Sequence, residues 1–404
     1  MESLLSDRGR GASSSVIRDL LRLTDRPEVL SLAGGLPAAG AFPVEELAAA
    51  AARILGPQTG RYGPGALQYG PTEGVGALRE WVADGHRHHG GASPADVIVT
   101  TGSQQALDLL ARALVDPGDC VVVESPTYLG ALQALAGSAP TVVAIPGDRH
   151  GIRTDLLEER LTRDRAMRPK LCYVVTNFQN PTGATLALDR RRHLAALADH
   201  HGFVVVEDDP YGQIRFAGPM LPPIRAFTDR VVTLGTASKV LAPGLRVGWL
   251  TAPVWLVGPL VRLKQAADLH TSTLTQHLAF ELLADSAFMA RHLDRLRALY
   301  AARCAALADA MQAELGPQFA FEAPAGGMFL WGRVQGASGR PIDGRGLLAR
   351  AIDAGVAFVP GDAFSVDGSF ADHLRLSFAS LSVEDLRVAA GRLARAVAVY
   401  DQKT

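Results

Sequence analysis

Short runs of β-branched and other apolar residues recur between residues 97 and 252, and this rhythm constrains the fold more than any other feature. Most runs are apolar at consecutive rather than alternate positions, which is typical of strands covered on both faces. Segments of helical length, such as Gln104 to Leu114 and Asp189 to His201, separate several of them. This spacing predicts an α/β fold with a mainly parallel, seven-stranded sheet sandwiched by helices. The expected strands are 97–100, 121–123, 142–145, 172–175, 204–206, 231–234 and 247–250.

The last of these strands is expected to run against its predecessor. Only about ten residues separate the strand that ends near Thr236 from the one that starts near Arg246, which is short for a parallel crossover.

The chain has 404 residues, which is more than one hydrophobic core usually fills. After residue 255 the pattern becomes helical, with a long helical stretch at 278–315 and strand-like pieces at 327–331 and 373–378. We therefore expect an N-terminal segment that packs with a small domain, a large α/β domain and a small α+β domain, at residues 1–41, 42–290 and 291–404.

Charge and hydropathy exclude several classes of protein. The formal net charge is −1 and no long basic run is present, which argues against a nucleic-acid partner. No stretch approaches the roughly 18 apolar residues of a membrane span, and no apolar signal core follows a charged start. A cytoplasmic protein is expected. The three cysteines form no CxxC pair and the histidine-rich pieces lack partners at ligand spacing, so no metal site is expected.

Polar residues follow five of the expected strands. In open α/β sheets ligands bind at the carboxyl ends of strands, so these residues mark a candidate site. Each group alone has an ordinary structural explanation as a helix cap, a turn or a solvated charge. Together they combine a helix N-terminus, an aromatic ring, an amide, an acidic pair and a lysine. The groups are Thr101 to Gln104, Glu124 to Tyr128, Asn177 to Gly183, Glu207 to Tyr211 and Thr236 to Lys239.

Lysine is scarce, since only four of the forty basic residues are lysines. Lys170 precedes a strand, Lys264 lies on a predicted helix and Lys403 is in the tail. Lys239 alone follows a buried strand next to the other polar groups.

This combination suits pyridoxal 5'-phosphate. That cofactor needs an amine for its aldehyde, a carboxylate for its ring nitrogen, a donor for its phenolic oxygen and a cradle for its phosphate. The nucleotide-binding loops, the zinc-protease motif and the serine-hydrolase elbow are all missing from the sequence.

With these motifs the chain resembles the class I/II aminotransferases, which are fold-type I pyridoxal-phosphate enzymes. It is most similar to their aminoadipate/kynurenine aminotransferase branch. The resemblance runs from Ser31 to Phe378. It rests on Leu67-Gln68-Tyr69-Gly70, Gly102-Ser103-Gln104-Gln105, Asn180-Pro181-Thr182-Gly183, Asp208-Asp209-Pro210-Tyr211, Ser238-Lys239 and Gly244-Leu245-Arg246-Val247-Gly248.

The resemblance implies that Lys239 forms the internal aldimine and shuttles the proton of the substrate. Asp208 would pair with the ring nitrogen. Local alternation does not choose between Asp208 and Asp209, and the choice rests on the three-residue spacing to Tyr211. Asn180 and Tyr211 would bind the phenolic oxygen.

The resemblance also assigns the other contacts of the cofactor. Tyr128 would stack on the ring. Tyr69 would reach the phosphate of the neighbouring subunit, which implies a homodimer. The phosphate would be held by Ser103, Gln104, Ser238 and Arg246, with Thr236 standing where relatives usually carry serine.

Three positions would bind the substrate together with Asn180. Arg375 resembles the clamp for the α-carboxylate, since a guanidinium offers two parallel donors. Gly35 and Arg18 correspond to an N-terminal segment that closes over the substrate. Arg18 either contacts a distal carboxylate or matches by coincidence in an arginine-rich chain.

The implied function is transfer of an amino group between an L-amino acid and a 2-oxo acid by a ping-pong mechanism, with 2-oxoglutarate and glutamate as one pair. A lyase, oxidase or cyclase that uses the same cofactor is the alternative. A ligand-sensing transcription regulator would need a basic DNA-binding domain, and only about thirty residues precede Ser31. Aminoadipate-like, aromatic, branched-chain and specialised amino acids all remain open as substrates.

Overall fold

The structure is a computed structural model that describes residues 4–6, 9, 28–56, 62–164 and 166–402. Arg18 lies outside the described residues.

The expected seven-stranded sheet forms, and its strands coincide with the apolar runs. A two-residue strand, β5 (Gly151–Ile152), extends it by pairing antiparallel with the outermost strand. From one edge to the other the seven strands are β2 (Val97–Thr100), β9 (Gly248–Thr251), β8 (Val231–Thr236), β7 (Val204–Asp208), β6 (Pro169–Val175), β3 (Cys120–Ser125) and β4 (Thr141–Asp148).

Strand β9 is antiparallel to both of its neighbours, β2 and β8, and the other pairs among the seven strands are parallel. The prediction from the short connection is therefore confirmed. Because β9 runs the other way, its first residue, Gly248, lies at the edge where the parallel strands end. Arg246 is thereby brought to the same edge as the residues that follow β2, β7 and β8.

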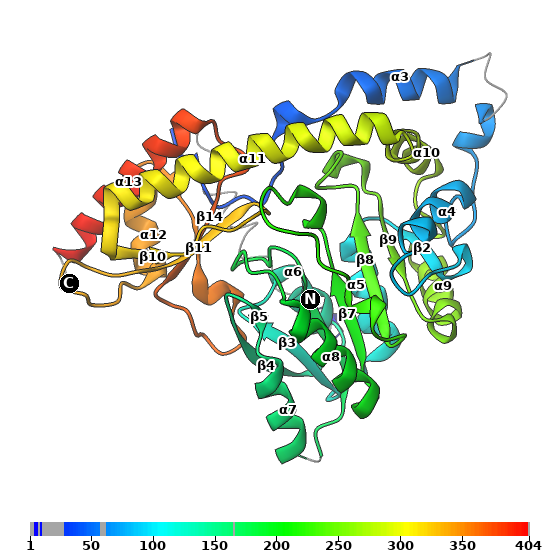
Figure 1. The fold of residues 1–404 in the computed structure, drawn as a ribbon, viewed down its shortest axis with the longest axis horizontal. Helices are drawn as coiled ribbons and strands as arrows, with labels where there is room; N and C mark the ends of the chain where they lie inside the picture. Colours follow the sequence, from blue (N-terminus) through cyan, green and yellow to red (C-terminus); the bar gives the residue numbers. More distant parts are fainter. Residues whose placement is uncertain (1–3, 7–8, 10–27, 57–61, 165, 403–404) are drawn as a thin grey trace.

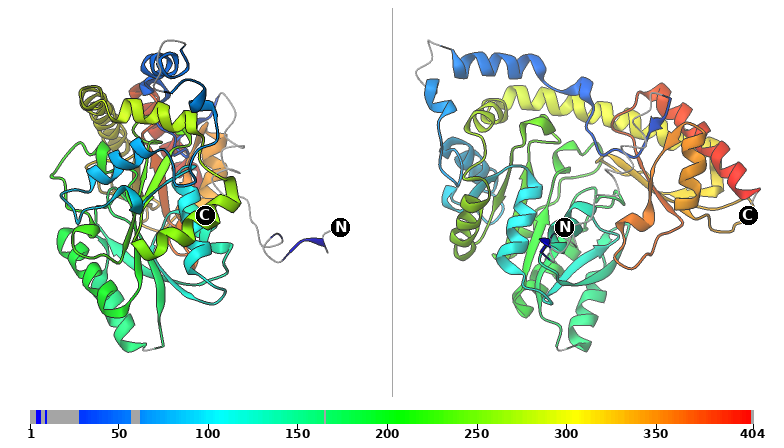
Figure 2. Two further views of the ribbon diagram at one scale, coloured as in Figure 1. Left: turned by 90° about the vertical axis from the view of Figure 1, so that its right-hand side faces the viewer. Right: turned by 180° about the vertical axis from the view of Figure 1, so that it is seen from behind.

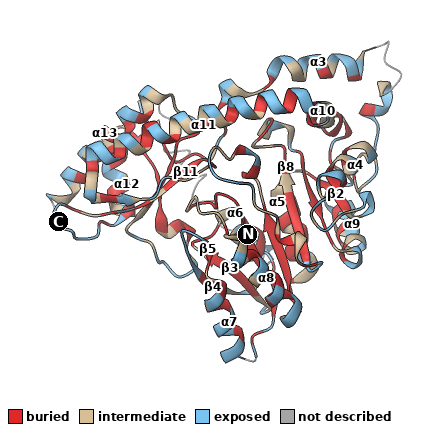
Figure 3. Ribbon diagram, viewed as in Figure 1, coloured by how far each residue is buried: buried red, intermediate tan, exposed pale blue. Residues whose placement is uncertain are grey.

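Helices cover both faces of this sheet (Figures 1 and 3). Cys172 and Val205 belong to one buried cluster, whereas Tyr173 and Val206 belong to the cluster on the opposite face. This two-sided burial explains why the strands are apolar at consecutive positions. The first face packs against α7 (Thr154–Arg163) and α8 (Leu188–His201), and the second packs against α5 (Ser103–Leu114), α6 (Leu129–Ala136) and α9 (Val254–Asp268).

A smaller antiparallel sheet lies beside the large one, as Figure 1 shows. Its strands, in spatial order, are β10 (Phe319–Phe321), β11 (Phe329–Val334), β14 (His373–Ser377) and β13 (Val359–Pro360). Helix α12 (Gly344–Asp353) packs against β13 of this sheet, and α13 (Val383–Asp401) packs against α12. Near the N-terminus, β1 (Leu30–Ser31) pairs in parallel with β12 (Val356–Ala357), so residues 30–31 are tied to this C-terminal part.

The long helical stretch predicted at 278–315 is two helices. The first, α10 (Thr273–Leu283), ends before Asp285, whose side chain accepts a hydrogen bond from Phe288 N and so caps α11 (Ser286–Leu315). Helix α11 extends along both sheets (Figures 1 and 2), and the division expected between residues 290 and 291 falls within it. The domain limits stay a prediction.

Two further helices, α3 (Val44–Leu55) and α4 (Gly76–Gly85), pack near α10. Among the described residues, no helix combines the length and the apolar character that a bilayer crossing requires.

Candidate active site

A cavity of about 300 Å³ lies at the edge where the parallel strands end. Twelve of the fourteen residues predicted from the sequence line it, which brings together side chains from five strand ends, the N-terminal loop and β14. They are Gly35, Ser103, Gln104, Tyr128, Asn180, Asp208, Tyr211, Thr236, Ser238, Lys239, Arg246 and Arg375.

Lys239 follows β8, and the turn that carries it is held by the hydroxyl of Thr236, which accepts a hydrogen bond from Ser238 N at 3.1 Å. The Nζ atom of Lys239 donates to the carbonyl oxygen of Gly35 at 3.0 Å. Burial, and then the positive charges of Arg375 and Arg246, lower the pKa of Lys239 to about 8. A sizeable fraction of this amine is therefore neutral at mildly alkaline pH, as a nucleophile or base requires.

The structure separates the two adjacent aspartates. Asp208, the last residue of β7, points into the cavity that contains Lys239. Asp209 lines a different cavity and accepts a hydrogen bond from Gly212 N at 2.9 Å. Successive residues of a strand point to opposite faces of the sheet, so the carboxylates of Asp208 and Asp209 point in opposite directions. The register of β7 with β6 and β8 determines which of the two faces the cavity.

The Asp208 carboxylate is buried and only half satisfied. Its Oδ2 atom accepts a hydrogen bond from the Tyr173 hydroxyl at 2.8 Å. Its Oδ1 atom is buried without a hydrogen-bond partner among the described residues. Burial raises the pKa of Asp208 to about 7, while the Tyr173 hydrogen bond and the charge of Lys239 act in the opposite direction. One acceptor thus remains available to a ligand.

The beginning of α5 forms an anion-binding end of the cavity. Gly102 precedes the helix with φ of 79°, a left-handed conformation that favours glycine, and a Cβ atom there would collide with the Arg246 guanidinium. Arg246 donates from Nη2 to the Thr101 carbonyl oxygen at 3.1 Å. Free amides at a helix N-terminus next to a guanidinium suit a phosphate.

A buried polar cluster holds Thr101 and Gln105, at the start of α5, by hydrogen bonds. The sequence analysis did not predict this cluster. Lys264 is fully buried and donates to Gln105 Oε1 at 2.9 Å, to Asp268 Oδ1 at 2.9 Å and to Thr271 Oγ1 at 3.1 Å. Thr101 Oγ1 donates to the same Asp268 at 2.8 Å. The amine of Lys264 is therefore engaged away from the cavity, although it too is buried.

Arg375 on β14 is 1% exposed and its guanidinium points into the cavity. It donates from Nη1 to Asn180 Oδ1 at 2.9 Å and from Nη2 to the Ala33 carbonyl oxygen at 2.6 Å. The rings of Phe329 and Phe364 lie 4.3 Å and 4.9 Å from it. Burial lowers the pKa of Arg375 to about 10, which leaves it charged at neutral pH. The hydrogen-bond partners of this charge are neutral, so it can attract a ligand carboxylate.

Two predicted residues are not in the cavity of this chain. Tyr69 is 77% exposed, and its ring meets His270 edge-on at 5.7 Å. Arg18 lies outside the described residues. Conversely, the sequence pointed to none of Tyr173, Phe329 or Phe364. Tyr173 and Phe329 lie in apolar runs that are typical of ordinary core, and Phe364 stands in a short segment that matches no motif.

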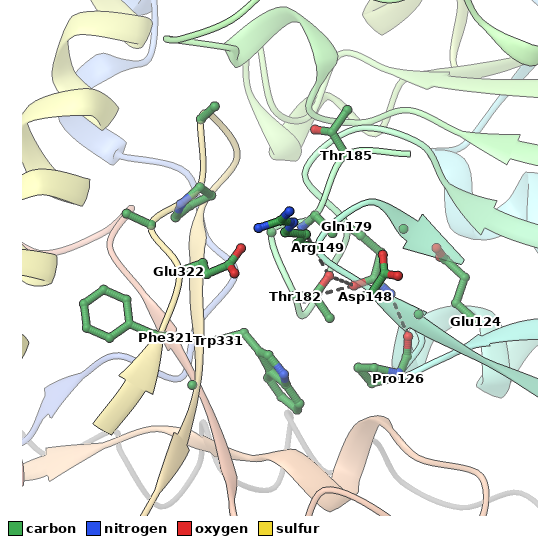
Figure 4. Close-up of a pocket in the computed structure, with 18 of the residues that line it drawn as sticks. Glu124, Pro126, Asp148, Arg149, Gln179, Thr182, Thr185, Phe321, Glu322 and Trp331 are labelled. Carbon is green, nitrogen blue, oxygen red and sulfur yellow. Dashed lines mark hydrogen bonds between the residues drawn. The ribbon is translucent and has the colours of Figure 1, made fainter. Parts of the chain in front are cut away.

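A larger cavity, of about 750 Å³, lies between the loop after β6 and the small sheet. Arg149, Glu322 and Trp331 face it from opposite sides in Figure 4. Members of two of the predicted polar groups line it, but none of the fourteen residues that were given individual roles does. The smaller cavity, which combines an activated amine, a carboxylate and a buried cation, is therefore the candidate active site.

Comparison with known proteins identifies the family of this chain. The family model described as "Aminotransferase class I and II" matches residues 27–393. The chain belongs to this aminotransferase family. The enzyme is accordingly an aminotransferase with pyridoxal phosphate as its cofactor, and its architecture is that of fold-type I.

The alignments with individual relatives extend over nearly the whole length of this aminotransferase. The 2-aminoadipate transaminase of Thermus thermophilus is 41% identical, over 96% of each chain. The aromatic-amino-acid aminotransferase 1 of Thermococcus litoralis is 38% identical and covers 98% of this chain and 94% of its own. The solved alpha-aminoadipate aminotransferase of Thermus thermophilus, complexed with N-(5'-phosphopyridoxyl)-L-leucine, has a TM-score of 0.88 at 39% identity, with 98% and 97% coverage.

Borohydride reduction should attach the cofactor to Lys239 alone. The reagent reduces a carbon–nitrogen double bond between an amine and an aldehyde, and Lys239 is the lysine whose amine lines the cavity. Peptide mapping by mass spectrometry would identify the labelled residue. Lys264 is the internal control, since it is buried but hydrogen-bonded elsewhere. Label on Lys264, Lys170 or Lys403 would contradict the assignment.

The rate of covalent attachment of pyridoxal phosphate to the apoprotein should rise with pH up to about 8 and then level off. Only the neutral amine attacks an aldehyde, and Lys239 is neutral above its lowered pKa of about 8. The measurement is the growth of visible absorbance after rapid mixing at a series of pH values. A rate that keeps rising toward 10.5, the ordinary value for lysine, would show that the surroundings do not lower the pKa of this amine.

Proposed function

We propose that this aminotransferase moves an amino group between an L-amino acid and a 2-oxo acid in two successive half-reactions, with 2-oxoglutarate and glutamate as one pair. The observation that carries the proposal is the convergence of Lys239, Asp208 and Arg375 on one cavity. These three groups supply a base, a carboxylate with a free oxygen and a charged carboxylate receptor.

The residues of the cavity fit pyridoxal phosphate at each end. The unpaired Oδ1 of Asp208 would accept a hydrogen bond from the protonated ring nitrogen. Tyr211 and Asn180 lie in the same cavity and would bind the phenolic oxygen, while Tyr128 would cover the ring. The phosphate would be held at the start of α5 by the residues Ser103, Gln104, Thr236, Ser238 and Arg246.

When bound, this cofactor supplies a ring that withdraws electrons from the α-carbon of the amino acid. Lys239 then has two tasks that its surroundings support. In its neutral form Nζ accepts the proton from the α-carbon, and its lowered pKa allows it to release that proton again. Its contact with the Gly35 carbonyl oxygen places the amine between the N-terminal loop and the sheet edge.

Arg375 would hold the α-carboxylate of the substrate. Its guanidinium is fixed by Asn180, the Ala33 carbonyl oxygen and two aromatic rings, so little conformational freedom is lost when a carboxylate binds. Its buried Nε atom has no hydrogen-bond partner among the described residues. A carboxylate held in this way would orient the α-hydrogen toward Lys239.

A homodimer would complete the site. Tyr69 is exposed and does not line the cavity of its own chain, which leaves its hydroxyl available to a second subunit. The cysteines in the described part of the chain, Cys120, Cys172 and Cys304, are free thiols, which supports a reducing compartment such as the cytoplasm. The roles of Arg18 and of a closing N-terminal segment stay predictions.

Adding single L-amino acids to the loaded enzyme should convert the visible absorption of bound pyridoxal phosphate to that of the pyridoxamine form. Glutamate, aminoadipate and aromatic amino acids are the first donors to screen, since aminoadipate and aromatic amino acids appear in the names of the relatives. Lys239→Ala should retain the cofactor and slow the conversion by about 100-fold to 10,000-fold, because the proton acceptor is lost.

Lys170→Ala is the control for this experiment, because Lys170 is a surface lysine that pairs with Asp119. It should convert at the rate of the unaltered enzyme. Transamination fails as the function if no amino acid converts the cofactor while Lys239→Ala still binds it. A product other than a 2-oxo acid would instead favour a lyase, oxidase or cyclase.

Arg375→Lys should raise the KM for amino acids by about 10-fold to 100-fold, since it retains a charge but loses the paired donors. Steady-state kinetics with the α-carboxylate donor and with its amide analogue test this. The variant should lose most of the preference for the free carboxylate, whereas cofactor affinity changes little. An unchanged preference would remove Arg375 from the substrate site.

A further inference from the structure

Tyr173 is a buried group next to the site for which neither the resemblance nor the mechanism has a task. Its hydroxyl donates to Asp208 Oδ2 at 2.8 Å, and both residues are buried, at 1% and 4% exposure. Tyr173 also lines the active-site cavity.

The strand register produces this contact. Tyr173 on β6 pairs with Val206 on β7, and Asp208 is two residues further along β7. Residues two apart on a strand share a face, so Asp208 is the diagonal neighbour of Tyr173 on the same face of the sheet. A tyrosine side chain is long enough to span that diagonal.

The direction of this hydrogen bond is determined by the surroundings. Burial, and then the negative charge of Asp208, raise the pKa of Tyr173 well above its ordinary value, so the phenol keeps its proton and donates it. Oδ2 of Asp208 is thereby occupied. Oδ1 is left as the buried acceptor without a partner among the described residues, on the carboxylate that faces the cavity.

The carboxylate needs such a donor. Burial and the neighbouring charge of Asp209 both favour the protonated form of Asp208, and Tyr173 and Lys239 favour the ionised form. The charge of Lys239 changes as its amine reacts. Tyr173 is fixed in the middle of β6, so its contribution persists while the state of Lys239 changes.

We propose that Tyr173 is a positioning residue, whose hydroxyl keeps the Asp208 carboxylate ionised and turned so that Oδ1 receives the N–H of the cofactor ring. The inference rests on the proposed role of Asp208 in cofactor binding. It adds a residue on a neighbouring strand that acts through Asp208 without touching the reacting atoms.

The test compares two ligands of the apoprotein: pyridoxal phosphate and its analogue in which a ring C–H replaces the ring nitrogen. Tyr173→Phe keeps the aromatic packing and removes only the hydroxyl. It should weaken pyridoxal phosphate about tenfold, as expected for a hydrogen bond to a charged group, and leave the analogue unchanged. Tyr300→Phe removes another fully buried hydroxyl, whose contact is Ala38 N, and should affect neither ligand.

A spectroscopic readout accompanies the affinities. In Tyr173→Phe the pH midpoint at which the visible band of the bound cofactor changes should move upward, since an unprotonated ring withdraws less charge from the carbon–nitrogen bond. Catalysis should decline in kcat, with little change in KM for the amino acid. Thermal unfolding of the apoprotein verifies that the variant is folded.

The outcomes separate this inference from the proposed function. Equal loss of both ligands in Tyr173→Phe would show a structural role only and overturn the inference, as would no loss of either. Asp208→Asn serves as the reference. If it discriminates between the ligands and Tyr173→Phe does not, the inference alone fails. If Asp208→Asn does not discriminate, the proposed role of Asp208 fails as well.

Discussion

Burial of both faces of the large sheet is the constraint on which the rest of the structure depends. A strand covered by helices on both sides has no room for unpaired polar side chains along its length, so these collect where the strands end. Lys239, Asp208 and the start of α5 all stand directly at such ends. The reversed strand β9 contributes to the same edge from its beginning, which is how Arg246 reaches the site.

The charges at this edge act on one another. Arg375 and Arg246 lower the pKa of Lys239 because both place positive charge near an amine that is already poorly solvated. Asp208 offsets part of this effect and is itself affected by burial. A base, a carboxylate and a carboxylate receptor in one small cavity therefore adjust their protonation together, which is typical of sites that handle protons.

A second set of buried polar groups stabilises the first. Lys264 and Asp268 hold the residues that precede α5, and Tyr173 holds the far oxygen of Asp208. The supporting groups do not themselves take part in binding a ligand. Each fixes a group that does, and such support determines how accurately a cofactor site is formed.

The sequence alone determined where the strands lie, the mainly parallel character of the sheet, the reversal of β9 and the residues that follow each strand. These properties depend on apolar periodicity and connection length, which are local along the chain. It also singled out Lys239, since three of the four lysines lack a strand end beside polar groups. The break between α10 and α11 was missed because apolar spacing continues across Asp285, and only the cap formed with Phe288 shows that one helix ends and another begins.

Only the tertiary structure showed that Asp208, which the resemblance had favoured over Asp209, is the carboxylate that lines the cavity. It also placed Lys264 in a buried network rather than on a helix surface, and it brought Tyr173 to the carboxylate. Each of these outcomes depends on register between strands or on packing between helices. Such contacts join residues that are tens to hundreds of positions apart, for example Arg375 and Asn180. The residue pattern of one segment does not show which side chain of a distant segment it will contact, because such contacts depend on how the whole core packs.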